Sequence, residues 1–286
     1  MALDQINVDE EKEMSFLDHL EELRWHVVRS VVAIMVFMIV AFIYTKEIFD
    51  HIVFAPAKPS FITFKWLCKI GHLTGNVDGL CITEIPFKVQ SRFMTGQFTM
   101  QFVSAFVIGL VVAFPYVVWE LWSFVRPGLH RREQKGSKGA VAAVTFLFAS
   151  GISFGYFILS PLMVWVFSTY SISDMIVNEF DITSYVQTIV ALTFGSGLLF
   201  QLPVVVFFMT KMGLLTPKFM RTYRKHAAVI ILIVAAVITP PDPLSQTIIA
   251  IPLYMLYEIS IFICAIEVRN KKKRDEAEAI LDEQTA

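Results

Sequence analysis

The sequence predicts an all-α integral membrane protein. Of its 286 residues, 56% are hydrophobic and 17% are charged, whereas a soluble domain carries about 25% charged residues. The charges gather in clusters between long uncharged runs, which is typical of membrane-spanning chains. The 26 phenylalanines exclude a disordered chain, because such chains are poor in aromatic residues. A net charge of −1 gives no basic surplus for binding nucleic acid.

Six apolar runs predict six transmembrane helices. A helix needs about 20 mostly apolar residues to cross a bilayer, so the first four runs are long enough and the last two are short. In chain order the runs are Val27–Tyr44, Phe98–Trp119, Ala140–Tyr170, Val186–Met209, Ala227–Ile238 and Ile248–Ile266.

Prolines predict where these helices bend or end. The third run is longer than one bilayer thickness, so we expect tilt, a bend at Pro161 or a projecting end. The fifth run stops at Thr239-Pro240-Pro241, because proline breaks a helix. The last two runs therefore predict a short helical hairpin, beside which the bilayer would be thin.

The placement of lysine and arginine predicts that both chain termini are cytoplasmic. The connections 171–185 and 239–247 contain neither residue. The long first connection, 45–97, does contain basic residues, but long loops translocate with less regard to charge. On the other side, the basic residues are Lys12, Arg24, Arg29, Arg126, Arg131, Arg132, Lys135, Lys138, Lys211, Lys218, Arg221, Arg224, Lys225, Arg269, Lys271, Lys272, Lys273 and Arg274.

This topology divides the chain into three parts. Residues 1–13 form an acidic N-terminal tail, and residues 268–286 form a charged cytoplasmic tail. Residues 14–267 form the six-helix membrane domain, with an external insert at about 46–96. Cys68 and Cys81 lie in that insert on the oxidising side, where they read either as a disulfide or as a pair of free, partly buried thiols.

The start of the first helix is amphipathic. The segment Ser15–Arg24 opens with Ser-x-x-Asp, a signature of helix N-termini. Glu21 and Glu22 point away from its apolar stripe, so they form either a solvated face or an acidic pair that could bind a cationic ligand. The stripe consists of Phe16, Leu20, Leu23 and Val27.

Few polar groups occur within the apolar runs. Gln201 and Glu258 are candidates for a functional site inside the membrane. Each has a plain alternative, since Gln201 could merely bond a neighbouring helix and Glu258 could satisfy a polar contact in the bundle. Gly151-x-x-x-Gly155 is a weak signal for close helix packing. We expect no metal site, cofactor or enzymatic centre, because no His, Cys and carboxylate constellation is present.

Three separated motifs resemble the TatC family, the core membrane subunit of the twin-arginine protein translocase. His19–Arg24 resembles the family's His-Leu-x-Glu-Leu-Arg motif, and Phe124–Glu133 resembles its Phe-x-x-Pro-x-Leu-x-x-x-Glu pattern. The strongest match is Thr239–Thr247 with the following Ala250-Ile251-Pro252. Ala55-Pro56 and Pro203 also sit where the family has them, so the resemblance extends over about Phe16 to Glu267.

The resemblance implies a cup-shaped six-helix bundle in the cell membrane, with both termini in the cytoplasm. Family members export folded proteins whose signal peptides carry consecutive arginines. They work with single-span TatA- and TatB-type partners, associate in a larger complex and depend on the proton-motive force. Two departures matter: Gln201 stands where several relatives have glutamate, and the cysteine-containing insert is unlike the shorter loop of well-known members.

Site residues follow from the resemblance at matching positions. The implied contacts to the signal peptide come from Glu22, Glu133, His19, Arg24 and Phe124. Thr239 and Gln246 match positions of partner-helix docking, and the short fifth helix adds Val237 to that docking surface. Pro56 and Asp242 mark external turns.

Other classes of protein fit the sequence less well. A secondary transporter of small solutes is the main alternative, but such proteins commonly show internal repeats and broken helices around a midplane site. We find no such repeat. A purely structural scaffold would explain the bundle but not the acidic residues predicted on the cytoplasmic face.

Overall fold

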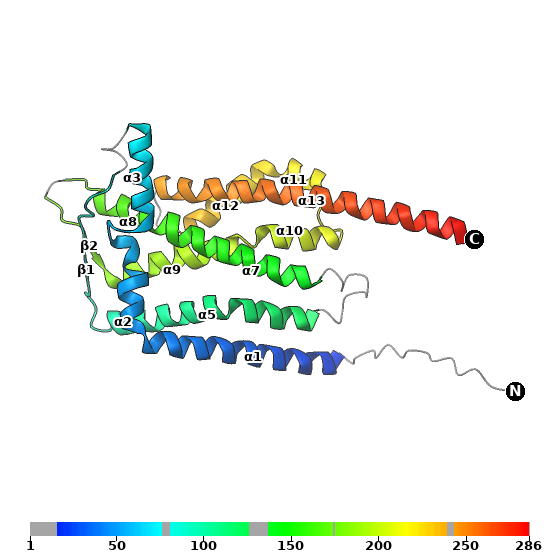
Figure 1. The fold of residues 1–286 in the computed structure, drawn as a ribbon, viewed down its shortest axis with the longest axis horizontal. Coiled ribbons are helices and arrows are strands. Elements are labelled where there is room, and N and C mark those ends of the chain that lie inside the picture. Colours follow the sequence, from blue (N-terminus) through cyan, green and yellow to red (C-terminus); the bar gives the residue numbers. More distant parts are fainter. Residues whose placement is uncertain (1–15, 76–80, 126–136, 174, 239–242, 286) are drawn as a thin grey trace.

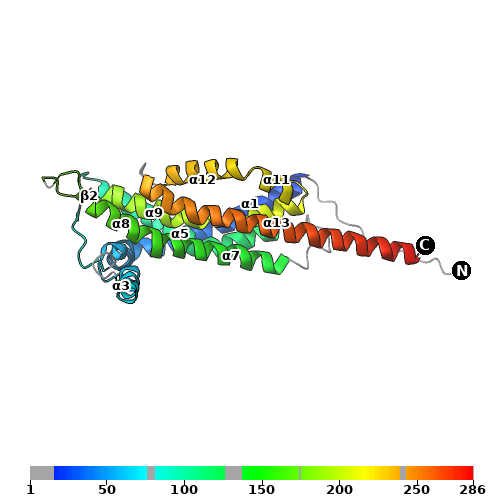
Figure 2. The ribbon, with the colours of Figure 1, turned by 90° about the horizontal axis from the view of Figure 1, so that it is seen from above.

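The structure is a computed structural model and describes residues 16–75, 81–125, 137–173, 175–238 and 243–285. Long helices lie side by side along one axis (Figure 1). We call the end at which α1 begins and α13 ends the terminal end. The opposite end, which carries α3, β1 and β2, is the capped end (Figures 1 and 2).

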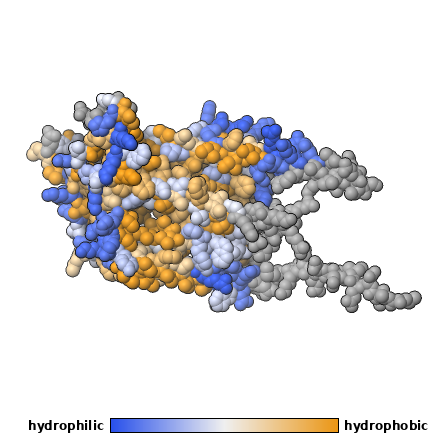
Figure 3. All heavy atoms as spheres, in the orientation of Figure 1, coloured by the Kyte–Doolittle hydropathy of each residue, from blue (hydrophilic) through white to orange (hydrophobic). Residues whose placement is uncertain are grey.

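Five helical segments of the described chain are long and apolar enough to cross a bilayer. They confirm that the chain is an all-helical, multi-pass membrane protein. Figure 3 shows hydrophobic surface over the middle of the bundle and hydrophilic surface toward both ends. The five segments are Glu21–Ile43, Gly96–Val125, Gly139–Thr169, Ile182–Lys211 and Gln246–Lys273.

The first two spans pack closely against each other. They are α1 (Phe16–Ile43) and α5 (Gly96–Val125), and the contact depends on Gly109. A Cβ atom at this position would lie 2.7 Å from the backbone nitrogen of Met38. The missing side chain therefore lets two backbones approach each other.

The third and fourth spans are each interrupted near a proline. The third runs through α7 (Ser137–Phe154), a π-helical turn (Gly155–Leu159) and α8 (Ser160–Thr169), in which Pro161 is buried near the start. The fourth consists of α9 (Ile182–Leu199) and α10 (Leu202–Lys211). It breaks at Phe200-Gln201, because Pro203 has no backbone N–H to donate to the Leu199 carbonyl oxygen and its ring clashes with that carbonyl.

Two glycines bring the third span against the fourth. A Cβ atom on Gly151 would lie 2.7 Å from the Ser196 carbonyl oxygen, and one on Gly155 would lie 2.5 Å from the Leu192 carbonyl oxygen. The weak Gly-x-x-x-Gly signal thus marks a real helix contact, and it is made within the chain.

The C-terminal part differs from the expected pair of short helices. After α11 (Pro217–Thr222), α12 (Arg224–Ile238) is short as predicted. The prediction that the last helix is also short is wrong, because α13 runs from Pro243 to Thr285 over 43 residues. The length of the apolar run was a poor guide to the length of the helix. The charged segment that follows the run is rich in Ala, Glu, Lys and Arg, which favour helix, so the helix continues through it. Pro252 lies inside α13 without ending it.

The capped end is built from short elements. The chain leaves α1 through α2 (Thr45–Ile48), a π-helical turn (Phe49–Val53) and a 3-10 turn (Ala55–Ala57), and then enters α3 (Ile62–Thr74). The two strands, β1 (Lys88–Gln90) and β2 (Glu179–Asp181), pair in parallel with Val89 opposite Phe180.

Asp181 joins this strand pair to the start of α9. Its carboxylate accepts from the Arg92 backbone N–H at 2.9 Å and from the Thr183 backbone N–H at 2.8 Å. The Arg92 bond, followed by those from Thr183, lowers the pKa of the Asp181 carboxyl below its usual value. Asp181 is therefore the N-cap of α9 and fixes the connection between the cap and the bundle.

Gly155→Ala should destabilise the protein by about 1–3 kcal/mol, because the added methyl group overpacks the contact with Leu192. Thermal unfolding in detergent would measure the loss. Gly139→Ala is the matched control, since nothing lies within 4 Å of a Cβ atom there. Equal melting temperatures for both variants would show that the α7–α9 contact does not need a glycine.

Candidate functional site

A buried carboxylate joins α1 to α5 near the terminal end. The side chain of Glu120 on α5 is only 2% exposed. His26 of α1 donates from Nδ1 to Glu120 Oε2 at 2.5 Å, and the Tyr116 hydroxyl donates to Oε1 at 2.5 Å. Both carboxylate oxygens therefore have a donor, as a buried charged group requires.

Helix geometry explains this arrangement. Tyr116 lies one turn before Glu120 on α5, so the two side chains share a face of the helix. His26 reaches them from the neighbouring helix, and its ring also contacts the ring of Phe124 edge-on, with 6.2 Å between centroids. The four residues hold the ends of α1 and α5 in one fixed arrangement.

Glu22 lies one helical turn before His26 on the same helix. Its side chain is half-buried, and its Oε2 atom is buried without a hydrogen-bond partner among the residues that the structure describes. A buried acceptor of this kind is costly unless something donates to it. Glu22 therefore has free capacity to accept a hydrogen bond from a cationic group.

The structure describes the other residues expected to contact a signal peptide only in part. Arg24 is exposed, with its guanidinium carbon 6.0 Å from the centre of the exposed Trp25 ring. The backbone of His19 belongs to α1, but its side chain lies outside the described part of the chain. Glu133 lies entirely outside the described residues. The structure thus brings Phe124 to the His26–Glu120 pair and leaves the pairing of Glu22 with Glu133 undescribed.

Sequence reasoning missed Glu120, His26 and Tyr116. Glu120 is the only charged residue between Gly96 and Val125, and a lone ionisable residue in a spanning helix is a strong signal. The expected second span ended at Trp119, one residue too early. Extending the apolar run through Glu120 would have revealed it.

The two polar residues expected inside the membrane bond to neighbouring helices. Gln201 donates from Nε2 to the Val144 carbonyl oxygen of α7 at 3.2 Å, while its Oε1 is buried with no partner in the described segments. Glu258 of α13 accepts from the Arg224 guanidinium of α12 at 2.7 Å. Both contacts stabilise helix packing, which was the plain alternative for each residue.

Two of the positions expected to dock a partner helix, Val237 and Gln246, lie near the capped end of α12. Val237 is 81% exposed, whereas Gln246 of α13 donates to the Leu232 carbonyl oxygen of α12 at 2.9 Å. Thr239 and Asp242 lie outside the described residues. Pro56 is buried in the 3-10 turn of the cap.

Cys68 and Cys81 form a disulfide in the structure, with 4.2 Å between their Cα atoms. The side chain of His72 lies close by, and the three residues are a geometrically possible metal-binding group. With both sulfur atoms joined to each other, the group offers no thiolate ligand.

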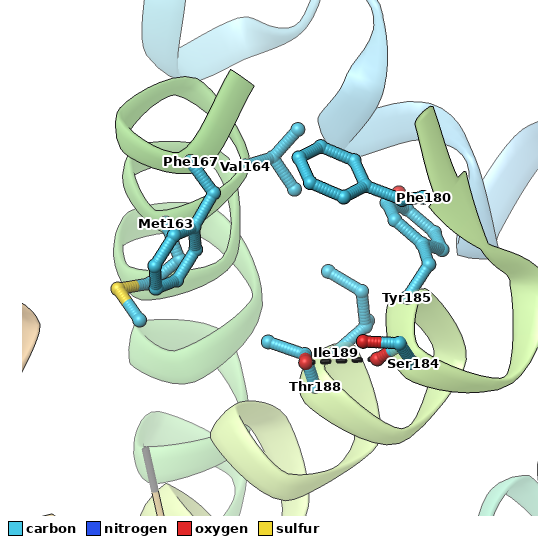
Figure 4. Close-up of a pocket in the computed structure, with 8 residues that line it drawn as sticks. All are labelled: Met163, Val164, Phe167, Phe180, Ser184, Tyr185, Thr188 and Ile189. Carbon is cyan, nitrogen blue, oxygen red and sulfur yellow. Dashed lines mark hydrogen bonds between the residues drawn. The ribbon is translucent and has the colours of Figure 1, made fainter. Parts of the chain in front are cut away.

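Two apolar cavities lie toward the capped end. The first, of about 230 Å³, lies between α8 and α9, with Met163 and Phe167 facing Phe180 and Thr188 (Figure 4). The second, of about 250 Å³, is lined by α5, α7, α9 and both π-helical turns, and includes Ser104 and Thr193. None of the residues lining either cavity is charged.

Replacing His26 should destabilise the protein through Glu120. His26→Ala leaves Oε2 of a buried carboxylate unsatisfied, which costs about 1–3 kcal/mol. The double variant His26→Ala/Glu120→Gln should recover part of that loss, because the remaining amide carries no charge. A double-mutant cycle of thermal stability in detergent measures the coupling. Strictly additive effects would contradict a direct His26–Glu120 interaction.

Known proteins match this chain over most of its length. The family model for the Sec-independent protein translocase protein TatC matches residues 18–252. The TatC protein of Blattabacterium sp. subsp. Periplaneta americana (strain BPLAN) is 38% identical over 256 residues, which cover 89% of this chain and 96% of the relative. TatCy of Bacillus subtilis (strain 168) is 35% identical over 267 residues, covering 93% and 94%.

The fold is also similar to a solved structure. The crystal structure of a twin-arginine translocase receptor, TatC, aligns with a TM-score of 0.68 at 24% identity and covers 87% of this chain and 99% of that one. At this identity the structural alignment supports only the fold, whereas the sequence matches establish the family. The chain therefore belongs to the TatC family, whose members are non-enzymatic components of Sec-independent protein translocation.

Proposed function

We propose that this protein is the component of a twin-arginine translocase that binds the signal peptides of folded proteins. The observation that carries the proposal is the half-buried Glu22, whose buried Oε2 has no partner among the described residues. A guanidinium group would supply the missing donor. It pairs with a carboxylate through two parallel hydrogen bonds, which lysine cannot reproduce.

Glu22 is held in place by its surroundings. The neighbouring His26 is bonded to Glu120 at 2.5 Å, so α1 is anchored to α5 one turn beyond Glu22. A site fixed in this way loses little side-chain entropy when it binds a ligand. Glu133 would supply the second carboxylate, as its place in the Phe124–Glu133 motif implies. His19, Arg24 and Phe124 would border the bound peptide.

The terminal end would face the cytoplasm, where signal peptides are presented. This orientation is supported by the basic residues of the connection 126–138 and of the C-terminal segment 269–274. In this topology α12, which precedes α13, would be the fifth of six crossings. Its 15 residues extend only about 22 Å at the α-helical rise, so the bilayer would be thin beside it.

The exposed face of α12 would receive the transmembrane helix of a TatA- or TatB-type partner. Val229, Ile233 and Val237 are all exposed and follow one another at helical spacing along one side. Gly151, which the sequence suggested for close helix packing, is not available to a partner because it is already packed against α9. Thr239 and Gln246 would add polar contacts worth only about 1 kcal/mol each, so shape and length must carry the specificity. The proton-motive force would drive transport in the assembled complex.

Removing the carboxylates should weaken binding of a twin-arginine signal peptide. For the Glu22→Ala/Glu133→Ala double variant in detergent, we expect at least about tenfold weaker binding, because each charge-assisted hydrogen bond contributes about 1.5–3 kcal/mol. Changing the signal arginines to lysines should weaken binding to the unmodified protein as well. Glu47→Ala, at an exposed position of the capped end, is the control and should bind normally. Unchanged affinity of the double variant would overturn the proposal.

Cysteine cross-linking tests the docking surface on α12. A cysteine at Val237 should cross-link efficiently to cysteines in the membrane helix of a TatA- or TatB-type partner. Phe146 on α7, which is similarly exposed at 73%, is the matched control and should give little product. Efficient cross-links from Phe146 and none from Val237 would place the partner on the opposite side of the bundle.

A further inference from the structure

Helix α3 runs across the bundle rather than along it. In Figure 1 it runs crosswise to the long helices, and in Figure 2 it is seen nearly end-on beside the bundle. It lies level with the end of α1 and the start of α13 (Figure 1). In a bilayer crossed by the long helices along their axes, α3 would lie parallel to the membrane surface at the depth where the spans end.

One face of α3 is fastened to the bundle. Phe64 is buried, and the hydroxyl of Thr63 donates to the Phe157 carbonyl oxygen. Just before the helix, the ring of Phe61 contacts the rings of Tyr156 and Phe157 at 5.6 and 5.9 Å between centroids. On the following turn the Cys68–Cys81 disulfide ties α3 to the chain that leads into β1. The helix therefore has a fixed rotation about its own axis.

The outward face of α3 is apolar. At about 100° per residue, four side chains fall within an arc of about 80°, and all four are exposed. The most exposed are Leu73 at 80% and Trp66 at 60%. We call these residues the α3 stripe: Ile62, Trp66, Ile70 and Leu73.

A basic edge borders this stripe on one side. The basic side chains Lys65, Lys69 and His72 are exposed. At about 100° per residue, all three lie on the same side of the α3 stripe. The Lys69 ammonium lies 5.9 Å from the centre of the Trp66 ring. Tryptophan beside lysine is typical of helices at membrane interfaces, where the ring sits among the headgroups and the ammonium reaches toward phosphate and water.

We propose that α3 is an interfacial membrane helix whose stripe inserts into the bilayer leaflet at the capped end. The occupant of the stripe is phospholipid. Its acyl region covers Trp66 and Leu73, and its phosphate groups face Lys65 and Lys69. The stripe continues the lipid-facing surface of the spans, since Phe157, which contacts Phe61, is itself exposed on the third span. Inserted in this way, α3 fixes the depth of the cap relative to the bilayer.

Nitroxide labels at single cysteines test this placement in the full-length protein. The background variant is Cys264→Ser, because Cys264 is the only free cysteine among the described residues. Labels at Leu73, Trp66 and His72 are compared in vesicles of phosphatidylethanolamine and phosphatidylglycerol. We expect the ratio of oxygen to nickel-chelate accessibility to be several-fold higher at Leu73 and Trp66 than at His72, because oxygen partitions into lipid and the chelate stays in water.

Two results would overturn the proposal. Equal accessibility ratios at all three positions would place the stripe in water. Strong dipolar coupling between Leu73 labels on different molecules, abolished by dilution with unlabelled protein, would show that a second copy of the chain covers the stripe instead. Two positions in the stripe, Leu73 and Trp66, are labelled so that a local distortion caused by one label does not decide the result. Unchanged thermal unfolding confirms that each labelled protein is folded. Signal-peptide binding at the terminal end is not involved in this result.

Discussion

The requirement that every backbone polar group in the bilayer be satisfied within the chain governs this fold. A continuous apolar segment meets this requirement by forming a helix, as the five long apolar segments do. Where the helices become irregular, polar side chains or altered turns compensate. Ser160 donates to the Gly155 carbonyl oxygen at 2.8 Å in the π-helical turn, whereas Gln201 at the break in the fourth span joins that span to α7 through the Val144 carbonyl oxygen. The glycines at 109, 151 and 155 then allow the helices to approach closely.

Two carboxylates near the terminal end have different chemistry although they lie on adjoining helices. Glu120 is saturated, with a donor on each oxygen, so it stabilises the contact between α1 and α5. Glu22 keeps a buried oxygen without a donor in the described chain. An unsatisfied buried acceptor costs about 1–3 kcal/mol, and a ligand that removes this cost gains the same amount in affinity. The saturated group positions the site, and the unsatisfied group is suited to binding.

At the capped end, short elements rather than long helices must be held in place. The cap is joined to the bundle by the Asp181 bonds to Arg92 and Thr183, and within the cap the Cys68–Cys81 disulfide ties α3 to the chain that leads into β1. It also uses the lipid surface if the α3 stripe inserts as proposed. The cap would then be fixed from two sides, by the protein beneath it and by the bilayer beside it.

The sequence by itself determined the membrane class, the positions of the spans and the family, because long apolar runs and contiguous motifs such as His19–Arg24 are local properties. It also offered a bend at Pro161 as one of three ways to accommodate the long third run, because local sterics act at a proline. Only the tertiary structure brought His26 to Glu120, since that pair is separated by 94 residues and depends on how α1 and α5 align. It likewise decided the direction of α3, which follows from aromatic contacts with the distant Tyr156 and Phe157. Local pattern sets which segments become helices, and packing between them sets which side chains meet.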